Sequence, residues 1–123
     1  MQLLPSLIKE IKKTDICHIH DVFYFSSIAA AIVAKILKKP VVMTQHVGMV
    51  HANPFLMLMQ KIVYHTFGKI VFNTSKKIIA YNPLVASFVA SLGVSKNKIV
   101  QIRNGVDLSL FSLSSKTTKL SLK

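Results

Sequence analysis

Short apolar runs alternate along this chain with longer stretches in which apolar residues recur every three or four positions. The short runs predict strands over residues 15–21, 40–45, 77–81 and 98–103. The longer stretches predict helices over 5–13, 26–38 and 54–72, and a further helix between Asn82 and Gly93. Strands that alternate with helices are typical of βαβ units. The pattern therefore predicts an α/β fold: a Rossmann-like open parallel sheet of about four strands with helices on both faces.

Residues with strong positional preferences mark the ends of two of these helices. Pro54 stands at the first position of the third helix, where its missing N–H costs nothing. Asn82 is a capping residue directly before Pro83, which suits the first turn of the fourth helix. Gly93 supplies the left-handed residue that commonly ends a helix. These signals agree with the boundaries that the apolar pattern predicts.

The segment from Lys39 to Gly48, KPVVMTQHVG, combines a strand with polar residues at its end. Its apolar run suits a strand buried on both faces, and His46 would emerge where the strand gives way to a loop. In open parallel α/β sheets, ligands bind outside the carboxyl ends of the strands. His46 is therefore a candidate site residue, and Gly48 permits either a close backbone approach to a ligand or a positive φ angle.

Two histidines on the preceding strand admit more than one interpretation. His18 and His20 are two residues apart, so they point to the same side of a strand. A metal site would need further ligands, and acidic residues are scarce. The pair fits equally well one core histidine and one at the end of the strand with local hydrogen bonds. The functional alternative is that His20, Asp21 and His46 line one crevice, where imidazoles bind hydroxyls or phosphates.

Basic residues dominate the charge of the chain. Sixteen lysines and arginines give a formal net charge of +12, against only Glu10, Asp15, Asp21 and Asp107. Such a charge favours anionic partners. Arg103 is the single arginine, whereas nucleic-acid readers rely on arginine, so nucleic acid is not the expected partner. The last residues, 112–123, hold no acid or aromatic residue and are predicted to be a disordered basic tail.

Other features exclude several classes of protein. Cys17 is the single cysteine, which excludes an internal disulfide and fits a packed core residue. No glycine-rich phosphate loop of the GxGxxG or GxxxxGK[ST] type is present. In the helix over 54–72, Lys61, His65 and Lys69 recur every four residues and form a polar stripe. This stripe indicates a surface helix rather than a membrane span, and it fits either a solvated face or a surface that an anionic membrane attracts.

Four segments, taken together, resemble the N-terminal domain of family 4 glycosyltransferases. They are DICHIHD (15–21), KPVVMTQHVG (39–48), KKIIAYNP (76–83) and LGVSKNKIVQIRNGVD (92–107), followed by Phe111. These enzymes are GT-B retaining transferases that move a sugar from a nucleotide-sugar donor to an acceptor. The resemblance implies that residues 1–111 form a partial, acceptor-side Rossmann-like domain.

The resemblance also implies roles for individual residues. His46 matches the histidine that lies beside the donor sugar and is needed for transfer, so it is the expected catalytic residue. His20 and Asp21 match residues at the mouth of the same cleft, and Gly48 lies close by; all three are expected to contact substrate. Asn104, Gly105 and Asp107 match the hinge turn that leads into a second domain.

The sequence departs from the family pattern at a few places. Arg103 stands where many members carry proline, and the 123 residues do not include the family's donor-binding C-terminal domain with its Glu-x7-Glu motif. The first strand of the N-terminal domain and its glycine-rich loop are also missing. We therefore expect a fragment truncated at both ends that does not transfer sugar by itself.

The expected substrates are a nucleotide-sugar and a glycan or lipid-linked acceptor, with no metal or other cofactor. We expect a cytoplasmic protein that is peripheral at the inner face of the membrane. The alternative function is a small basic, non-catalytic α/β module that binds phosphate-bearing ligands or nucleic acid. Salt-dependent binding to nucleic acid that is unaffected by His46→Ala would favour that alternative. A third interpretation is a non-functional remnant, which would be insoluble or molten when expressed alone.

Overall fold

The computed structural model describes residues 3–50 and 53–105. Its helices are α1 (Leu3–Lys13), α2 (Phe25–Ile36), α3 (Pro54–Val63), α4 (Lys69–Thr74) and α5 (Pro83–Ser91). A π-helical segment (Tyr64–Gly68) joins α3 to α4, and a short 3-10 helix covers Lys96–Lys98. The strands are β1 (Cys17–His20), β2 (Val41–Gln45), β3 (Ser75–Ala80) and β4 (Ile99–Gln101). The predictions made for Asp107 and for the tail over 112–123 lie outside the described residues.

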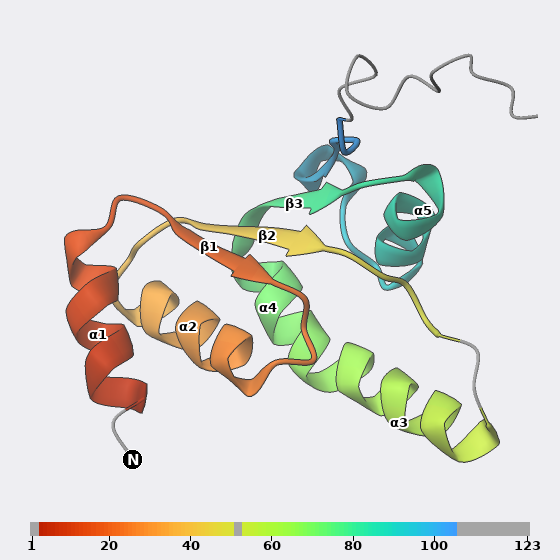
Figure 1. The fold of residues 1–123 in the computed structure, drawn as a ribbon, viewed down its shortest axis with the longest axis horizontal. Helices are drawn as coiled ribbons and strands as arrows, with labels where there is room; N and C mark the ends of the chain where they lie inside the picture. Colours follow the sequence, from red (N-terminus) through yellow and green to blue (C-terminus); the bar gives the residue numbers. More distant parts are fainter. Residues whose placement is uncertain (1–2, 51–52, 106–123) are drawn as a thin grey trace, which may run out of the picture.

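The strands form one parallel sheet in the order β1-β2-β3-β4 (Figure 1). The predicted fold class, a Rossmann-like α/β fold with an open parallel sheet of four strands, is confirmed. In the register of the sheet, His20 lies beside Thr44 and Gln45 lies beside Ala80. The carboxyl ends of the first three strands therefore meet at one edge, as the expected site requires.

The helices that connect the strands pack on the same face of the sheet. Consecutive strands are neighbours, and right-handed crossovers between them place each connecting helix on the same side. The buried core accordingly includes the inward-facing Ile19, Met43 and Ile78 together with Val71 from α4 and Val89 from α5. We expected helices on both faces. Among the described residues, the strand order does not reverse, and a reversal is what sends helices to the second face.

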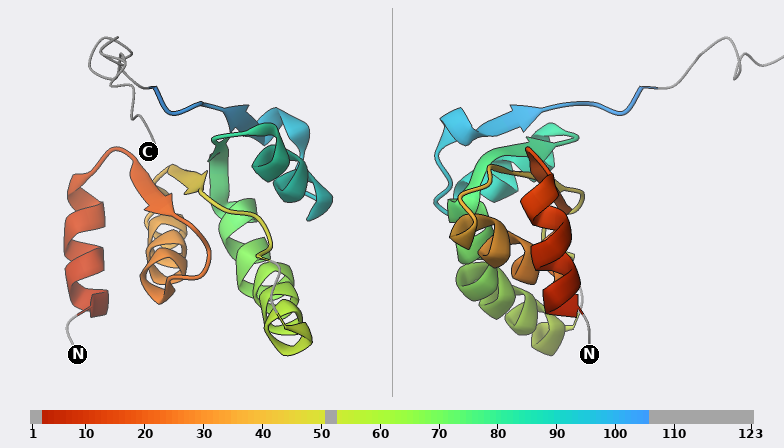
Figure 2. Two further views of the ribbon diagram at one scale, coloured as in Figure 1. Left: turned by 45° about the vertical axis from the view of Figure 1, so that its right-hand side comes forward. Right: turned by 90° about the vertical axis from the view of Figure 1, so that its left-hand side faces the viewer.

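The outward face of the sheet carries the polar side chains. Along β1, Cys17 and Ile19 are buried while His18 and His20 are exposed, which is the period of two that a strand imposes. Figure 2 shows α1, α2, α3 and α4 gathered below the strands of the sheet. The histidines thus lie on the surface that the described helices leave uncovered.

The expected helix over 54–72 is present, but it is divided into three pieces. Asn53 caps α3 through its side-chain oxygen, which accepts a hydrogen bond from the Leu56 N–H at 2.9 Å, and Pro54 follows. The π-helical segment inserts the buried Tyr64 and Gly68 between α3 and α4. At the end of α5, Gly93 has a φ of +85°, as the left-handed stop requires.

Cys17 belongs to the packed core. Burial raises the pKa of its thiol, which keeps it protonated and poorly nucleophilic at neutral pH. A packed and unreactive thiol is what the sequence predicts at this position.

Candidate active site

A pair of histidines joins the carboxyl ends of β1 and β2. His20 ends β1 and His46 directly follows β2, and the parallel register brings their rings together. The His20 Nδ1 and His46 Nε2 atoms are 2.8 Å apart, within hydrogen-bond distance. The ring centroids are 5.1 Å apart. Two of the residues predicted for the site therefore contact one another directly.

Tyr81 completes this arrangement from the end of β3. Its hydroxyl forms a hydrogen bond with Nδ1 of His46, and the two rings meet edge to face with centroids 4.8 Å apart. Both ring nitrogens of His46 are thus engaged, one by His20 and the other by Tyr81. Tyr81 was not among the residues predicted from the sequence. Its position directly after a third parallel strand is the signal that would have found it.

Asp21 orients the backbone of His46 rather than its ring. The Asp21 carboxylate accepts a hydrogen bond from the His46 backbone N–H at 2.9 Å. Its own N–H donates to the Thr44 carbonyl at 2.9 Å, which extends the pairing of β1 with β2. Asp21 has a φ of +50°, a left-handed conformation that aspartate tolerates better than most residues. The turn after β1 is therefore shaped to bring this carboxylate to the end of β2.

His18 lies one strand position behind the pair. Its Nε2 is 2.8 Å from the Thr44 hydroxyl, and its ring centroid is 4.6 Å from that of His20. Burial lowers the pKa of His18, and repulsion from His20 and His46 lowers it further. His18 is therefore a neutral residue at physiological pH that supports the ring of His20.

Buried polar side chains from β2 and the helical segment after α3 hold the loop that follows His46. The Gln45 amide donates to the Val47 carbonyl at 2.7 Å and to the Tyr64 hydroxyl at 3.2 Å. The Tyr64 hydroxyl in turn lies 3.4 Å from the Gly48 carbonyl. Burial is the main cause that raises the pKa of Tyr64 to about 12, with the charge of Asp21 next. This phenol therefore stays a hydrogen-bond donor throughout the physiological range.

Gly48 is required by packing and not by its backbone angle. Its φ is not positive, since Gly93 is the described glycine with that property. A Cβ placed on Gly48 would come within 3.3 Å of Cγ in Phe88, which is tighter than ordinary contact. The missing side chain therefore lets the loop after β2 lie against α5.

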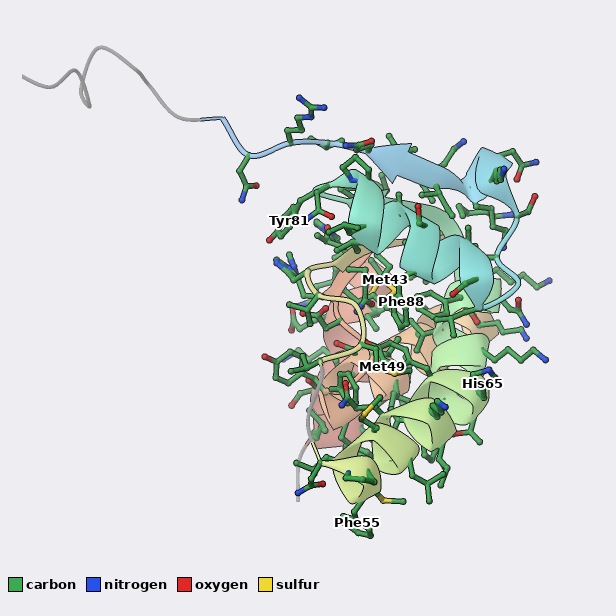
Figure 3. All side chains as sticks on the ribbon, turned by 90° about the vertical axis from the view of Figure 1, so that its right-hand side faces the viewer. Met43, Met49, Phe55, His65, Tyr81 and Phe88 are labelled. Carbon is green, nitrogen blue, oxygen red and sulfur yellow. The ribbon has the colours of Figure 1, made fainter. Side chains whose placement is uncertain are left out.

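An open pocket of about 570 Å³ lies next to this loop. His46 and Asn82 contribute its polar lining, while Gly48, Leu84 and Phe88 belong to its mainly apolar wall. Figure 3 shows Tyr81 at the same side of the molecule, above Phe88 and Met49. The predicted residues His20, Asp21, His46 and Gly48 thus gather at one edge of the sheet, beside a cavity.

A comparison with models of protein families decides the family. The model that describes Glycosyltransferase Family 4 matches residues 1–110, which is most of the 123-residue chain. The chain belongs to glycosyltransferase family 4. The family that the sequence segments resemble is therefore confirmed.

A solved structure supports the family fold. The chain is similar to the Anabaena protein Alr3699/HepE, whose crystal structure is a complex with UDP, with a TM-score of 0.60 and 16% sequence identity. The match covers 88% of this chain and 28% of the Anabaena chain, so the family 4 domain described here spans less than a third of that protein. No curated protein sequence matches the chain.

The expected hinge residues follow β4 in this family 4 domain. Asn104 and Gly105 are exposed beyond the end of β4, and no hydrogen bond joins them to the site within the described residues. Asp107 lies outside those residues. Residues 3–50 and 53–105 contain no group of three or more histidine, cysteine or acidic side chains arranged to hold a metal ion.

Proposed function

We propose that this family 4 domain forms the acceptor-side wall of a glycosyltransferase site in which His46 contacts the transferred sugar. The proposed donor is a nucleotide-sugar, and the proposed acceptor is a glycan or a lipid-linked saccharide. The observation that carries the proposal is the hydrogen-bonded row His20, His46 and Tyr81 at the carboxyl edge of the sheet, beside the pocket. This edge is where open parallel sheets bind ligands.

The hydrogen bonds within the row indicate how His46 would act. Neutral imidazole carries one N–H, so its two ring nitrogens cannot both donate. When Tyr81 donates to Nδ1, the Nε2 atom donates to His20; when the first bond reverses, so does the second. His46 is thereby held in one orientation, and its tautomer is coupled to the directions of both hydrogen bonds, so that it can exchange its His20 contact for a sugar hydroxyl.

Asp21, His20 and Gly48 have supporting roles in this proposal. His20 and Asp21 are proposed to stand at the mouth of the site and to meet sugar hydroxyls. Gly48 keeps the adjoining loop close to Phe88, which maintains the pocket wall. Because the ring nitrogens of His46 already have protein partners and acids are scarce, we propose that these residues act without a metal or other cofactor.

The proposal includes a second, donor-binding domain. The chain spans 28% of the similar protein that was solved with UDP, and we propose that the nucleotide would bind in a C-terminal domain, as the family resemblance implies. Asn104, Gly105 and Asp107 would form the turn into such a domain. We therefore expect the 123 residues alone not to transfer sugar. We propose a cytoplasmic location, with which the single free and buried cysteine, Cys17, is compatible.

Nuclear magnetic resonance on the histidine rings tests the site. The chain is labelled with ¹⁵N-histidine and titrated with UDP, a panel of nucleotide-sugars and simple saccharides. The ring signals of His46 and His20 are expected to shift with a sugar ligand. His65 is the internal control: it is exposed, its ring is hydrogen-bonded to the Lys61 carbonyl, and its signals should not shift.

Two results would contradict parts of this proposal separately. Equal shifts at His65 and His46, or no shift at His46 with any ligand of the panel, would refute the assigned site. Transfer of a radiolabelled sugar by the 123-residue chain would refute the need for a second domain while leaving the site intact. Nucleic-acid binding that persists in His46→Ala, without any response to sugars, would favour a basic binding module.

A further inference from the structure

Helix α3 presents apolar side chains to solvent instead of to the core. None of its residues is buried. Phe55 is 67% exposed, Leu58 is 54% exposed and Ile62 is 44% exposed. Their spacing of three and four residues places them on one side of the helix. Figure 3 shows Phe55 at the outer end of α3, pointing away from the rest of the protein.

The opposite side of α3 is the one that contacts the protein. The Gln60 amide donates to the Val50 carbonyl and accepts from the Val50 N–H, both at 2.8 Å. Tyr64, directly after α3, is 1% exposed and packs against Phe88. A surface helix of a soluble domain normally turns its apolar stripe inward. In α3 an apolar stripe also faces outward, and such a surface patch marks a binding partner.

The charges near this stripe identify the chemistry of the partner. No acidic residue occurs between Val22 and Gly105, whereas nine lysines and Arg103 do. Lys61 lies on α3 itself and Lys69 begins α4, and both are exposed. A stripe of aromatic and aliphatic side chains flanked by lysines complements a lipid surface with anionic headgroups. A nucleic acid would use the lysines but would leave the apolar stripe in water.

We propose that the outward stripe of α3, formed by Phe55, Leu58 and Ile62, binds the surface of an anionic membrane. These side chains enter the boundary between headgroups and acyl chains, while Lys61 and Lys69 contact anionic headgroups. The helix lies on the membrane and does not cross it: no described helix is long and apolar enough to span a bilayer. This inference stands independently of the proposed glycosyltransferase site.

A tryptophan reporter tests the depth of the stripe. The natural chain has no tryptophan, so Phe55→Trp introduces a single fluorophore. With vesicles of phosphatidylcholine and phosphatidylglycerol, its emission is expected to move to shorter wavelengths and to be quenched by brominated acyl chains. The matched control is Leu84→Trp on α5, because Leu84 is 82% exposed and belongs to a different helix. Its emission should change little.

Vesicle flotation tests the roles of apolar side chains and lysines. The double variant Leu58→Ser/Ile62→Ser is expected to lose binding to the anionic vesicles. Lys61→Gln should weaken partitioning about fivefold, the factor that corresponds to ~1 kcal/mol for one lysine near an anionic surface. Lys96→Gln, an exposed lysine before β4, is the control for general charge and should have a smaller effect. Circular dichroism verifies that each variant keeps its helices.

Three outcomes would overturn the proposal. The first is that neither flotation nor an emission shift occurs with anionic vesicles at low salt. The second is an equal response of Phe55→Trp and Leu84→Trp, which would show that α3 has no special role. The third is an emission shift of Phe55→Trp that depends on protein concentration without lipid, which would assign the stripe to a second copy of the chain.

Discussion

At the residue scale, His46 is defined by the groups at its two ring nitrogens. His20 belongs to β1 and Tyr81 follows β3, so the contacts of one imidazole tie three strands together. The Asp21 carboxylate adds a contact to the backbone of the same residue. A histidine held at both nitrogens and at its N–H has little freedom to rotate. It is therefore preorganised for a defined partner.

Replacing Tyr81 by phenylalanine tests the control of the His46 tautomer. The change removes the hydroxyl at Nδ1, so the ratio of the two neutral tautomers should move toward that of a free histidine side chain in water. The ¹⁵N shifts of the two ring nitrogens of His46 report this ratio. The free energy of unfolding should fall by about 1 kcal/mol, the value of one hydrogen bond. Tyr24→Phe, an exposed tyrosine outside the row, is the control. Unchanged His46 signals in Tyr81→Phe would show that Tyr81 does not determine the tautomer of His46.

The lowered pKa of His18 makes the stability of the domain depend on pH. In the unfolded chain His18 titrates near the ordinary histidine pKa of 6.5, whereas in the folded state partial burial and then the nearby His20 and His46 lower its pKa. The unfolded chain therefore binds more protons in the interval between the two values. The contribution of His18 to stability is full above 6.5 and is lost as the pH falls through the lower, folded pKa.

Urea unfolding measures this dependence. The wild-type midpoint is expected to fall between about pH 7.5 and about pH 5, and the variant His18→Gln should show a smaller fall. Glutamine keeps a donor that reaches the Thr44 hydroxyl, so the variant removes the titration while keeping a polar contact. An equal fall in both proteins would assign the pH dependence to other groups.

At the element scale, the sequence predicts the strands and the helix starts better than it predicts their arrangement. Short apolar runs identify the strands because strands within a sheet are largely buried. The starts of α3 and α5 are predictable because Asn53 and Asn82 cap them with local hydrogen bonds. The π-helical segment depends on the fit of Tyr64 against Gln45 and Phe88. Those contacts come from distant parts of the chain, so no local pattern predicts them.

The same distinction applies to the candidate site. His20, Asp21 and His46 are predictable because each stands at the end of an apolar run. Tyr81 stands at such an end too, but aromatic residues are common in strands, so its type alone carries no signal. The apolar stripe of α3 escapes prediction for a different reason: an apolar helix is normally explained by burial. Only the exposures in the structure show that this stripe faces outward.

The contact between the loop after β2 and α5 gives a prediction at this scale. Gly48→Ala is expected to lower the free energy of unfolding by about 1 kcal/mol, because the new Cβ meets Phe88 at 3.3 Å and the pair must separate. Gly105→Ala is the matched control, since nothing lies within 4 Å of its Cβ position. Denaturant unfolding compares the two variants. A loss in both of equal size would point to a general effect of replacing loop glycines.

At the scale of the whole molecule, the candidate site and the outward apolar stripe of α3 lie on different elements. The uncovered face and carboxyl edge of the sheet carry the histidines and Tyr81, and α3 extends from the loop that follows the same edge (Figure 1). If α3 lies on a membrane, the site edge is brought close to that membrane. A lipid-linked acceptor would then be within reach of His46. The two proposals are thus compatible, although each is tested without the other.

The unbalanced charge of the molecule gives the last prediction. With a net charge of +12, the positive side chains repel one another in the compact folded state, and salt screens that repulsion. Screening of salt bridges should cost little stability. The one ion pair among the described residues, Lys13 with Glu10, has both side chains well exposed. Raising sodium chloride from about 20 mM to about 300 mM should therefore raise the melting temperature by a few degrees.

Differential scanning calorimetry measures this change, and the choice of salt separates general screening from anion binding. Sodium chloride and sodium acetate at equal ionic strength should raise the melting temperature equally if screening is the cause. A fall in the melting temperature with salt would show that attractive pairs outweigh the repulsion among lysines. Because no acid lies between Val22 and Gly105, that outcome would require ion pairs for these lysines, and the one ion pair among the described residues is Lys13 with Glu10.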